Sequence, residues 1–159
     1  MAATATKERP IACHQHEVRG ILDGRQTMLR RVVKTIPEVH KAVRTAEHVA
    51  GATWKLRGDN GTWMDVTCPF GGPGSVLWVQ ETWQRLSNGG PAERDFDGIR
   101  DDVFYRADES DPAAVPLSGK WRPSTTMPRW ASRLTLELTE VRVERDGEWC
   151  WCMSFVRCP

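Results

Sequence analysis

Near the N-terminus the apolar residues change from helical to strand spacing, which predicts a short strand, a helix and a second strand. Apolar residues at helical spacing give the segment 15–23 one face that can pack: Val18, Ile21 and Leu22. Asp23-Gly24 follows, and glycine readily takes the left-handed conformation in which many helices end. The chain then enters a cation-rich strand, which brings three guanidinium groups to one edge of the fold: Arg25, Arg30 and Arg31.

The middle of the chain predicts a second helix and then a hairpin. Residues 35–38 have the form of a capping box, and apolar residues at helical spacing extend the predicted helix over 38–49. Two short strands are expected near 52–57 and 62–67. The turn between them contains Asn-Gly, a strong hairpin signal, so the two strands are expected to pair.

A dense apolar run at 76–83 predicts a central strand, and the segment 103–107 predicts a short one. Two segments rich in charged residues, glycine or proline, 87–102 and 108–123, are expected to be loops. Further on, apolar residues occupy even positions from 134 to 138 and odd positions at 141 and 143. This change of parity predicts a β-bulge or a bend near Thr139-Glu140, which would help to close a barrel.

A turn at Asp146-Gly147 is expected to lead into the final strand, whose large apolar residues share one face: Trp149, Trp151, Met153 and Phe155. The chain has 159 residues, enough for one domain with a buried core. Residues 1–8 are polar and are expected to be a flexible tail before a single domain over 9–159.

Charge and hydropathy limit the function classes. The formal net charge is +1, so only a local basic patch could serve nucleic acid. No apolar run approaches the ~20 residues that a membrane helix needs, and the N-terminal tail lacks the apolar core of a signal peptide. A cytosolic protein without a membrane partner is therefore expected.

Cysteine and tryptophan usage bear on metal binding and on base stacking. Five cysteines make an odd number, which is typical of reduced thiols in a cytosolic protein. Cys150 and Cys152 share a strand face, but no second pair of ligands stands at suitable spacing, so no metal is expected. Most of the eight tryptophans should fill the core. Trp83 and Trp130 are predicted to lie at a rim, where rings can stack on bases, because arginines and a carboxylate stand beside them.

Short motifs run in a fixed order over nearly the whole chain, with gaps at 35–60 and 87–102: RPI at 9–11, VRGILDGR at 18–25, Thr27, RRVVK at 30–34, CPFG at 68–71, LWVQETW at 77–83, YRAD at 105–108 and MPRWASR at 127–133. In order and spacing they resemble the ASCH domain, a PUA-like β-barrel, and most closely the short ASCH-like proteins encoded by bacteriophages and prophages. The resemblance implies an α+β fold: a small, mostly antiparallel barrel of five or six strands with two or three flanking helices.

The best-defined catalytic proteins of this family are bacterial acetylcytidine amidohydrolases, whose motif after the helix runs Gly-x-Lys-Thr-x-Thr-x-Arg. Here Gly24, Thr27 and Arg31 match that motif. Gln26 stands at the catalytic lysine position and Leu29 at the catalytic threonine position. Activating a hydroxyl nucleophile requires a base or a cation beside it, and leucine has no hydroxyl. Acetylcytidine hydrolysis is therefore not expected, although Thr27 and Glu81 are weak candidates for another hydrolytic site.

Glu81 lies on a predicted core strand, and a buried carboxylate needs a partner. Arg30 and Arg31 are adjacent on a strand, so their side chains point to opposite faces. Arg31 matches the family arginine and is predicted to face inward, paired with Glu81 or holding an anionic ligand. Arg30 is predicted to face solvent or a partner. The alternative is a purely structural arginine–glutamate pair.

Three functions follow from the resemblance, and the residues do not separate them. The first is a non-catalytic RNA- or nucleotide-binding module. The second is a phage-encoded interaction protein that inhibits a host defence complex, as anti-CRISPR proteins do. The third is an altered nucleoside amidohydrolase. All three imply the cytosol of a host bacterium and no cofactor. The predicted ligand-binding residues form one cleft: Arg25, Gln26, Thr27, Arg30, Arg31, Glu81, Trp83, Arg129 and Trp130.

Overall fold

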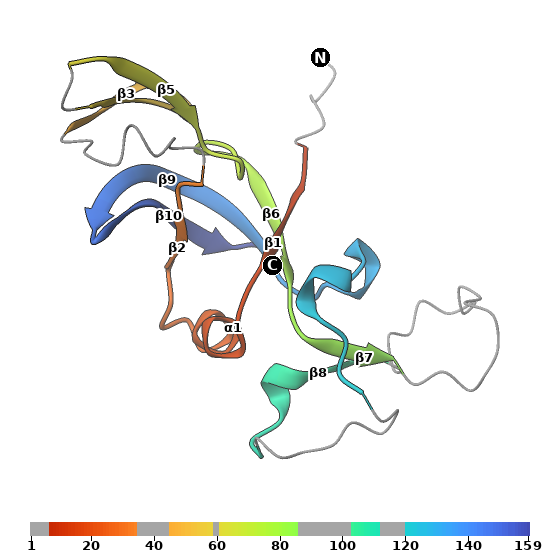
Figure 1. The fold of residues 1–159 in the computed structure, drawn as a ribbon. Helices are drawn as coiled ribbons and strands as arrows, with labels where there is room; N and C mark the ends of the chain where they lie inside the picture. The colour runs from red at the N-terminus through yellow and green to blue at the C-terminus, as the bar shows by residue number, and fades with distance from the viewer. Residues whose placement is uncertain (1–6, 35–44, 59–60, 86–102, 112–119) are drawn as a thin grey trace, which may run out of the picture. The chain divides into compact units, whose positions relative to one another are not determined.

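A computed structural model gives the fold of the chain and describes residues 7–34, 45–58, 61–85, 103–111 and 120–159 (Figure 1). These residues form a mixed α+β structure of mostly strands, with antiparallel sheets, so the predicted class is confirmed. Contacts along the chain separate two compact units. The first unit comprises 1–9, 26–77 and 135–159, and the second comprises 10–25 and 78–134.

The largest sheet has the strand order β1-β6-β9-β10-β2. Its strands are β1 (Arg9–Ala12), β2 (Met28–Val32), β6 (Val76–Gln80), β9 (Thr135–Asp146) and β10 (Glu148–Arg157). The predicted β-bulge is confirmed in the β9–β10 hairpin, because Ser154 pairs with Glu140 whereas the next residue, Phe155, pairs with Leu138. The predicted turn is also confirmed: Gly147 has a φ of 75°, in the left-handed region that glycine adopts readily.

A smaller sheet in the first unit has the order β3-β4-β5, with β3 at Thr45–Ala50, β4 at Thr53–Arg57 and β5 at Trp63–Thr67. The hairpin of β4 and β5 was predicted and is confirmed by the pairing of Arg57 with Trp63. The predicted helix over 38–49 is wrong in its last part. Residues 45–50 form β3 and pair antiparallel with β4, because this ladder satisfies their backbone groups; residues 38–44 lie outside the described part.

The second unit contains α1 (Gln15–Leu22), which confirms the predicted helix. The backbone N–H of His14 donates to the Glu17 carboxylate at 2.8 Å, and the helix ends at Asp23, before Gly24 with a φ of 71°. The other elements that lie wholly in this unit are β7 (Trp83–Arg85), β8 (Val103–Tyr105), and the 3-10 helices η2 (Arg106–Asp108), η3 (Ser124–Thr126) and η4 (Arg129–Ala131).

Two predicted strands are shorter than expected. The apolar run at 76–83 breaks at residues 81–82, between β6 and β7, and the segment 103–107 leaves β8 for η2. The predicted loop 87–102 and residues 112–119 of the second loop lie outside the described residues. Within the described ranges the strands do not close into a barrel, so the barrel stays a prediction. No described helix is long and apolar enough to cross a membrane.

Each unit has buried apolar residues of its own. In the first unit they come mainly from β9 and β10, where Trp151, Cys152 and Met153 are all buried. Three consecutive buried residues require cover on both faces of β10, whereas one buried face was predicted. In the second unit Trp83, Val103, Met127 and Ala131 form a cluster, with Tyr105 packed against it. This second cluster supports the residues of the candidate site.

Candidate functional site

Glu81 stands at the break between β6 and β7, and only 2% of its surface is exposed. Arg133 holds its carboxylate through two hydrogen bonds, from Nε to Oε1 at 2.9 Å and from Nη2 to Oε2 at 3.0 Å. A planar guanidinium matches both oxygens of a carboxylate at once. This bidentate pair gives Glu81 the partner that a buried charge requires.

Arg133 contacts a second carboxylate and an aromatic ring in the same unit. Its Nη1 and Nη2 donate to Asp108 at 2.9 and 2.8 Å, and its guanidinium carbon lies 4.0 Å from the ring centroid of Tyr105. The Tyr105 hydroxyl in turn donates to the carbonyl of Ala131 at 2.8 Å. Arg133 therefore joins three segments that are distant in the sequence: the β6–β7 break, η2 and the end of η4.

Burial raises the pKa of Glu81, and the charge of Asp108 acts in the same direction, while Arg133 opposes both. Burial alone would lower the pKa of Arg133. Its hydrogen bonds to Glu81 and Asp108 outweigh that effect and hold the pKa above its ordinary value. Arg133 therefore stays charged, and its charge offsets part of the cost of burying the Glu81 carboxylate. Because Arg133 holds both oxygens of that carboxylate, the geometry is that of a structural ion pair.

The arginine that pairs with Glu81 is Arg133, so the predicted pairing of Glu81 with Arg31 is wrong. The sequence favoured Arg31 because it matches a family motif, but sequence order does not show which arginine meets a buried carboxylate. Arg30 is exposed and pairs with Glu144 at 3.3 Å and Asp146 at 2.8 Å, all in the first unit. Arg31 is half-buried and donates from Nη1 to the carbonyl of Arg30 at 2.7 Å.

The amidohydrolase positions have structural roles on or before β2. Leu29 is buried, with 1% of its surface exposed. The amide of Gln26 donates to the carbonyl of Met28 at 3.2 Å. Thr27 is exposed, and its carbonyl accepts a hydrogen bond from the backbone of Phe155 at 3.0 Å. Because Thr27 and Glu81 belong to different units, their predicted cooperation in a hydrolytic site stays a prediction.

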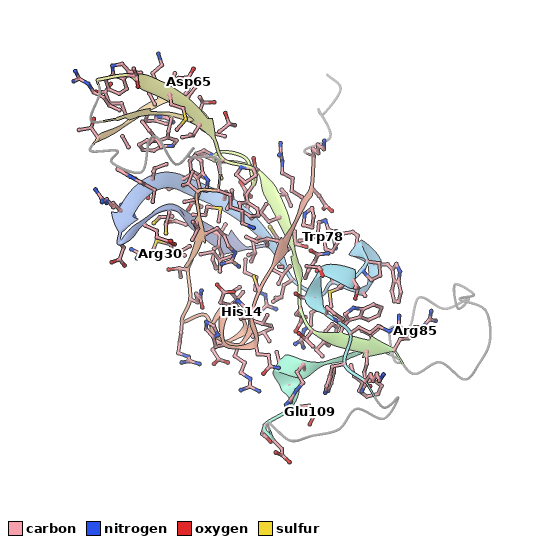
Figure 2. The ribbon with its side chains drawn as sticks, viewed as in Figure 1. His14, Arg30, Asp65, Trp78, Arg85 and Glu109 are labelled. Carbon is pink, nitrogen blue, oxygen red and sulfur yellow. The ribbon has the colours of Figure 1, made fainter. Side chains whose placement is uncertain are left out.

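The second unit also holds a row of two tryptophans with an arginine at each end, called here the Trp130 cluster: Arg85, Trp130, Trp83 and Arg122. The guanidinium of Arg85, at the end of β7 (Figure 2), lies 5.4 Å from the ring centroid of Trp130. The Trp130 and Trp83 rings meet edge to face, with centroids 6.0 Å apart. The guanidinium of Arg122 lies 5.1 Å from the Trp83 ring.

The two tryptophans of this cluster differ in exposure. Trp130 has 49% of its surface exposed, as expected of a ring at a rim, whereas Trp83 has only 3%. Trp83 is fixed further by a hydrogen bond from its Nε1 to the Thr126 hydroxyl at 3.3 Å and by backbone hydrogen bonds with Arg122. The prediction that Trp83 lies at a rim is therefore wrong. The buried Trp83 ring packs against Trp130, and Trp130 has the accessible ring.

The exposed ring lies within a locally basic stretch of sequence. Residues 120–133 contain four basic residues and no acidic ones, although the whole chain carries a formal charge of only +1. Of these, Lys120, Arg122 and Arg129 are exposed. Arg133 is half-buried and pairs with Glu81 and Asp108. Arg25, another predicted ligand residue, is exposed and pairs with Asp23. A locally basic segment, which the low net charge does not exclude, therefore surrounds Trp130 in the sequence.

The sequence analysis did not identify five residues of these two arrangements: Arg85, Tyr105, Asp108, Arg122 and Arg133. Two of them, Arg85 and Arg122, could have been identified as partners of aromatic rings, because each lies close to a tryptophan in the sequence, as in Trp83-Gln84-Arg85 and Trp121-Arg122. Arg133 belongs to the MPRWASR motif at 127–133, but the sequence did not indicate its function. All five cysteines are free, and the described residues contain no group of three potential ligands for a metal ion.

No family model, curated protein or solved structure matches this chain.

Proposed function

We propose that this chain is a non-catalytic RNA- or nucleotide-binding module of the ASCH-like type. The observation that carries the proposal is the half-exposed Trp130 ring within a basic stretch that has no acidic residue. Proteins bind RNA by stacking unpaired bases on aromatic rings and by contacting phosphates with basic side chains. The proposal includes closure of the strands into a PUA-like barrel and a cytosolic location in a host bacterium.

Local charge is the relevant quantity for this function. A chain with a net charge of +1 has no global field that attracts polyanions. Lys120, Arg122 and Arg129, however, place three exposed cations within ten residues of sequence. Counterion release from phosphates would give these cations a binding free energy that falls with added salt. The basic stretch can therefore serve nucleic acid without making the whole protein basic.

The state of the candidate catalytic groups supports binding over hydrolysis. Both oxygens of the Glu81 carboxylate accept hydrogen bonds from Arg133. Leu29, at the position of the catalytic threonine, is buried and has no hydroxyl. A hydrolase would need an activated nucleophile and a base within hydrogen-bond reach of each other.

Fluorescence anisotropy of a labelled single-stranded RNA tests the proposal. Between about 50 and 200 mM salt, the logarithm of the association constant should fall with a slope of about −2 to −3, which corresponds to three or four phosphate contacts. Arg122→Ala and Arg129→Ala should each reduce that slope by about 0.7. Arg142→Ala is the matched control, because it removes one exposed arginine that pairs with Glu140 and Glu144 in the first unit. Absence of binding at the lowest salt, or an equal effect of Arg142→Ala, would contradict the proposal.

A further inference from the structure

The Trp130 ring is held in place by the residues that follow it. Ala131 is fully buried, and its carbonyl accepts a hydrogen bond from Tyr105. The hydroxyl of buried Ser132 donates to the carbonyl of Val79 at 2.7 Å. These hydrogen bonds hold the chain next to Trp130, and the edge-to-face contact with Trp83 supports the exposed indole before any ligand arrives. A rigid aromatic surface loses little conformational entropy when a ligand stacks on it.

The arginines at the two ends of the cluster are also partly ordered by the rings. Arg85 lies over Trp130 and Arg122 lies over Trp83. A guanidinium stacked on an aromatic ring keeps its N–H groups in its own plane, where they can still donate to an anion. One accessible ring with a cation at each end of the row matches the repeating unit of a polynucleotide, in which each base is flanked by phosphates.

We propose that the Trp130 cluster binds single-stranded nucleic acid, with one unpaired base stacked on Trp130 and the flanking phosphates contacted by Arg85 and Arg122. This inference rests on the proposed RNA- or nucleotide-binding function and narrows it to unpaired strands. In a duplex the bases are stacked on one another, so their faces are not accessible to a protein ring, whereas single strands offer every base face. Stacking accepts any base, so binding tolerates different sequences.

The first unit contains a second exposed tryptophan, which serves as a matched control. Trp63 has 42% of its surface exposed and lies 5.5 Å from the guanidinium of Arg57. Its surroundings differ in charge: residues 45–67 contain three acidic and two basic residues, compared with no acidic and four basic residues in 120–133. In the register of the β3–β4–β5 sheet, Lys55 stands directly opposite Glu47 on one side and Asp65 on the other. This sheet therefore lacks the excess of cations that a phosphate backbone requires.

The test measures binding of three probes to the full chain: single-stranded RNA, single-stranded DNA of the same sequence, and the RNA as a blunt duplex, each about 12 nucleotides long, within the site size of known single-strand binders. Single strands should bind at least tenfold more tightly than the duplex. Trp130→Ala should weaken single-strand binding by about 5- to 150-fold, Trp130→Phe should retain most of it, and Trp63→Ala should change it less than twofold. Tighter binding of RNA than of DNA would identify RNA as the ligand. Equal binding of the two would show that the site recognises bases and phosphates, which both single strands share.

Two results would overturn the inference, and they are distinguishable. If RNA binds with the expected salt dependence but the duplex binds equally well, or Trp130→Ala and Trp63→Ala have equal effects, then single-strand stacking on Trp130 is wrong while the proposed function stands. If none of the three probes binds at low salt, the inference and the proposed function both fail. Melting curves of each variant establish that the fold is intact, and Trp130→Phe provides the comparison if Trp130→Ala melts early.

Discussion

The bidentate pair of Arg133 and Glu81 predicts a specific loss of stability when the cation alone is removed. Arg133→Met replaces the aliphatic stem of arginine with a similar unbranched side chain but removes the guanidinium, which leaves the buried Glu81 carboxylate without its partner. Removing one member of a buried pair costs about 3–5 kcal/mol, because the remaining charge is stranded. Arg133 has 22% of its side chain exposed, so water compensates part of that loss, and about 2–3 kcal/mol of unfolding free energy is expected.

For a chain of this length, such a loss lowers the melting temperature by about 4–12 °C. Arg30→Met is the matched control, because Arg30 also contacts two carboxylates, Glu144 and Asp146, but on the exposed surface. Exposed pairs contribute little to stability, so the Arg30 variant should melt close to the unchanged protein. Differential scanning fluorimetry at neutral pH gives both values, and urea denaturation gives the free energies.

A double variant tests the reasoning independently. When both members of a buried ion pair are replaced by apolar residues, the desolvation cost of the charges disappears together with their attraction. Glu81→Leu combined with Arg133→Met should therefore recover most of the stability that Arg133→Met alone removes. The account is refuted if the double variant is less stable than Arg133→Met, or if Arg30→Met and Arg133→Met melt alike.

Three further predictions concern pH, thiol reactivity and packing. Burial raises the pKa of Glu81 in the folded state, so the stability that the protonated Glu81 side chain contributes is present below pH 4.5 and is lost as the pH rises through the folded pKa. Urea melts at a series of acidic pH values should therefore show that the stability of the unchanged protein, minus that of Glu81→Gln, falls over this range and is constant above it. Burial, together with Glu144, raises the pKa of Cys152 to about 11, so iodoacetamide at pH 8 should label this thiol only after unfolding, and rapid labelling of the folded protein, detected by mass spectrometry, would contradict this. A Cβ at Gly72 would lie 2.8 Å from the backbone carbon of Gly51, so Gly72→Ala should cost about 1–3 kcal/mol in urea melts, whereas Pro73→Ala at the exposed neighbour should not lower the midpoint comparably.

Elements that depend on local spacing could be predicted from the sequence. The α1 helix follows from apolar residues at helical spacing and a glycine stop, and both are found as expected. The β-bulge follows from the change of parity between Leu138 and Val141, and the pairing of β9 with β10 has it at that place. In both cases the signal and the structure involve residues within a few positions of one another.

The helix expected over 38–49 shows where this reasoning fails. Its signal was a helical period, but Thr45–Ala50 is a strand because β4 offers it an antiparallel partner. Pairing between strands is a tertiary interaction, and it overrides a weak local preference. The sequence contains the period but does not contain the location of β4 in space.

The partner of Glu81 could not be predicted for a related reason. That a carboxylate on a core strand needs a cation followed from burial alone, and the structure has such a pair. The identity of the cation depends on a contact between residues 52 positions apart, and the chain offers 22 basic residues. For Trp83, the charged neighbours in the sequence predicted an exposed ring at a rim. Contacts with Val103, Met127 and Ala131, which are distant in the sequence, bury that ring instead.

RNA binding by this protein is tested most directly by a pull-down of the tagged full chain from a bacterial lysate, carried out with and without nuclease. RNA should co-purify with the protein at low salt, be released at high salt and be absent after nuclease treatment. The Trp130→Ala variant should recover less RNA than the Trp63→Ala variant. The RNA recovered should be chemically unchanged after incubation with the protein. A stoichiometric host protein that remains bound after nuclease treatment, with no RNA retained by the untreated sample, would contradict the account.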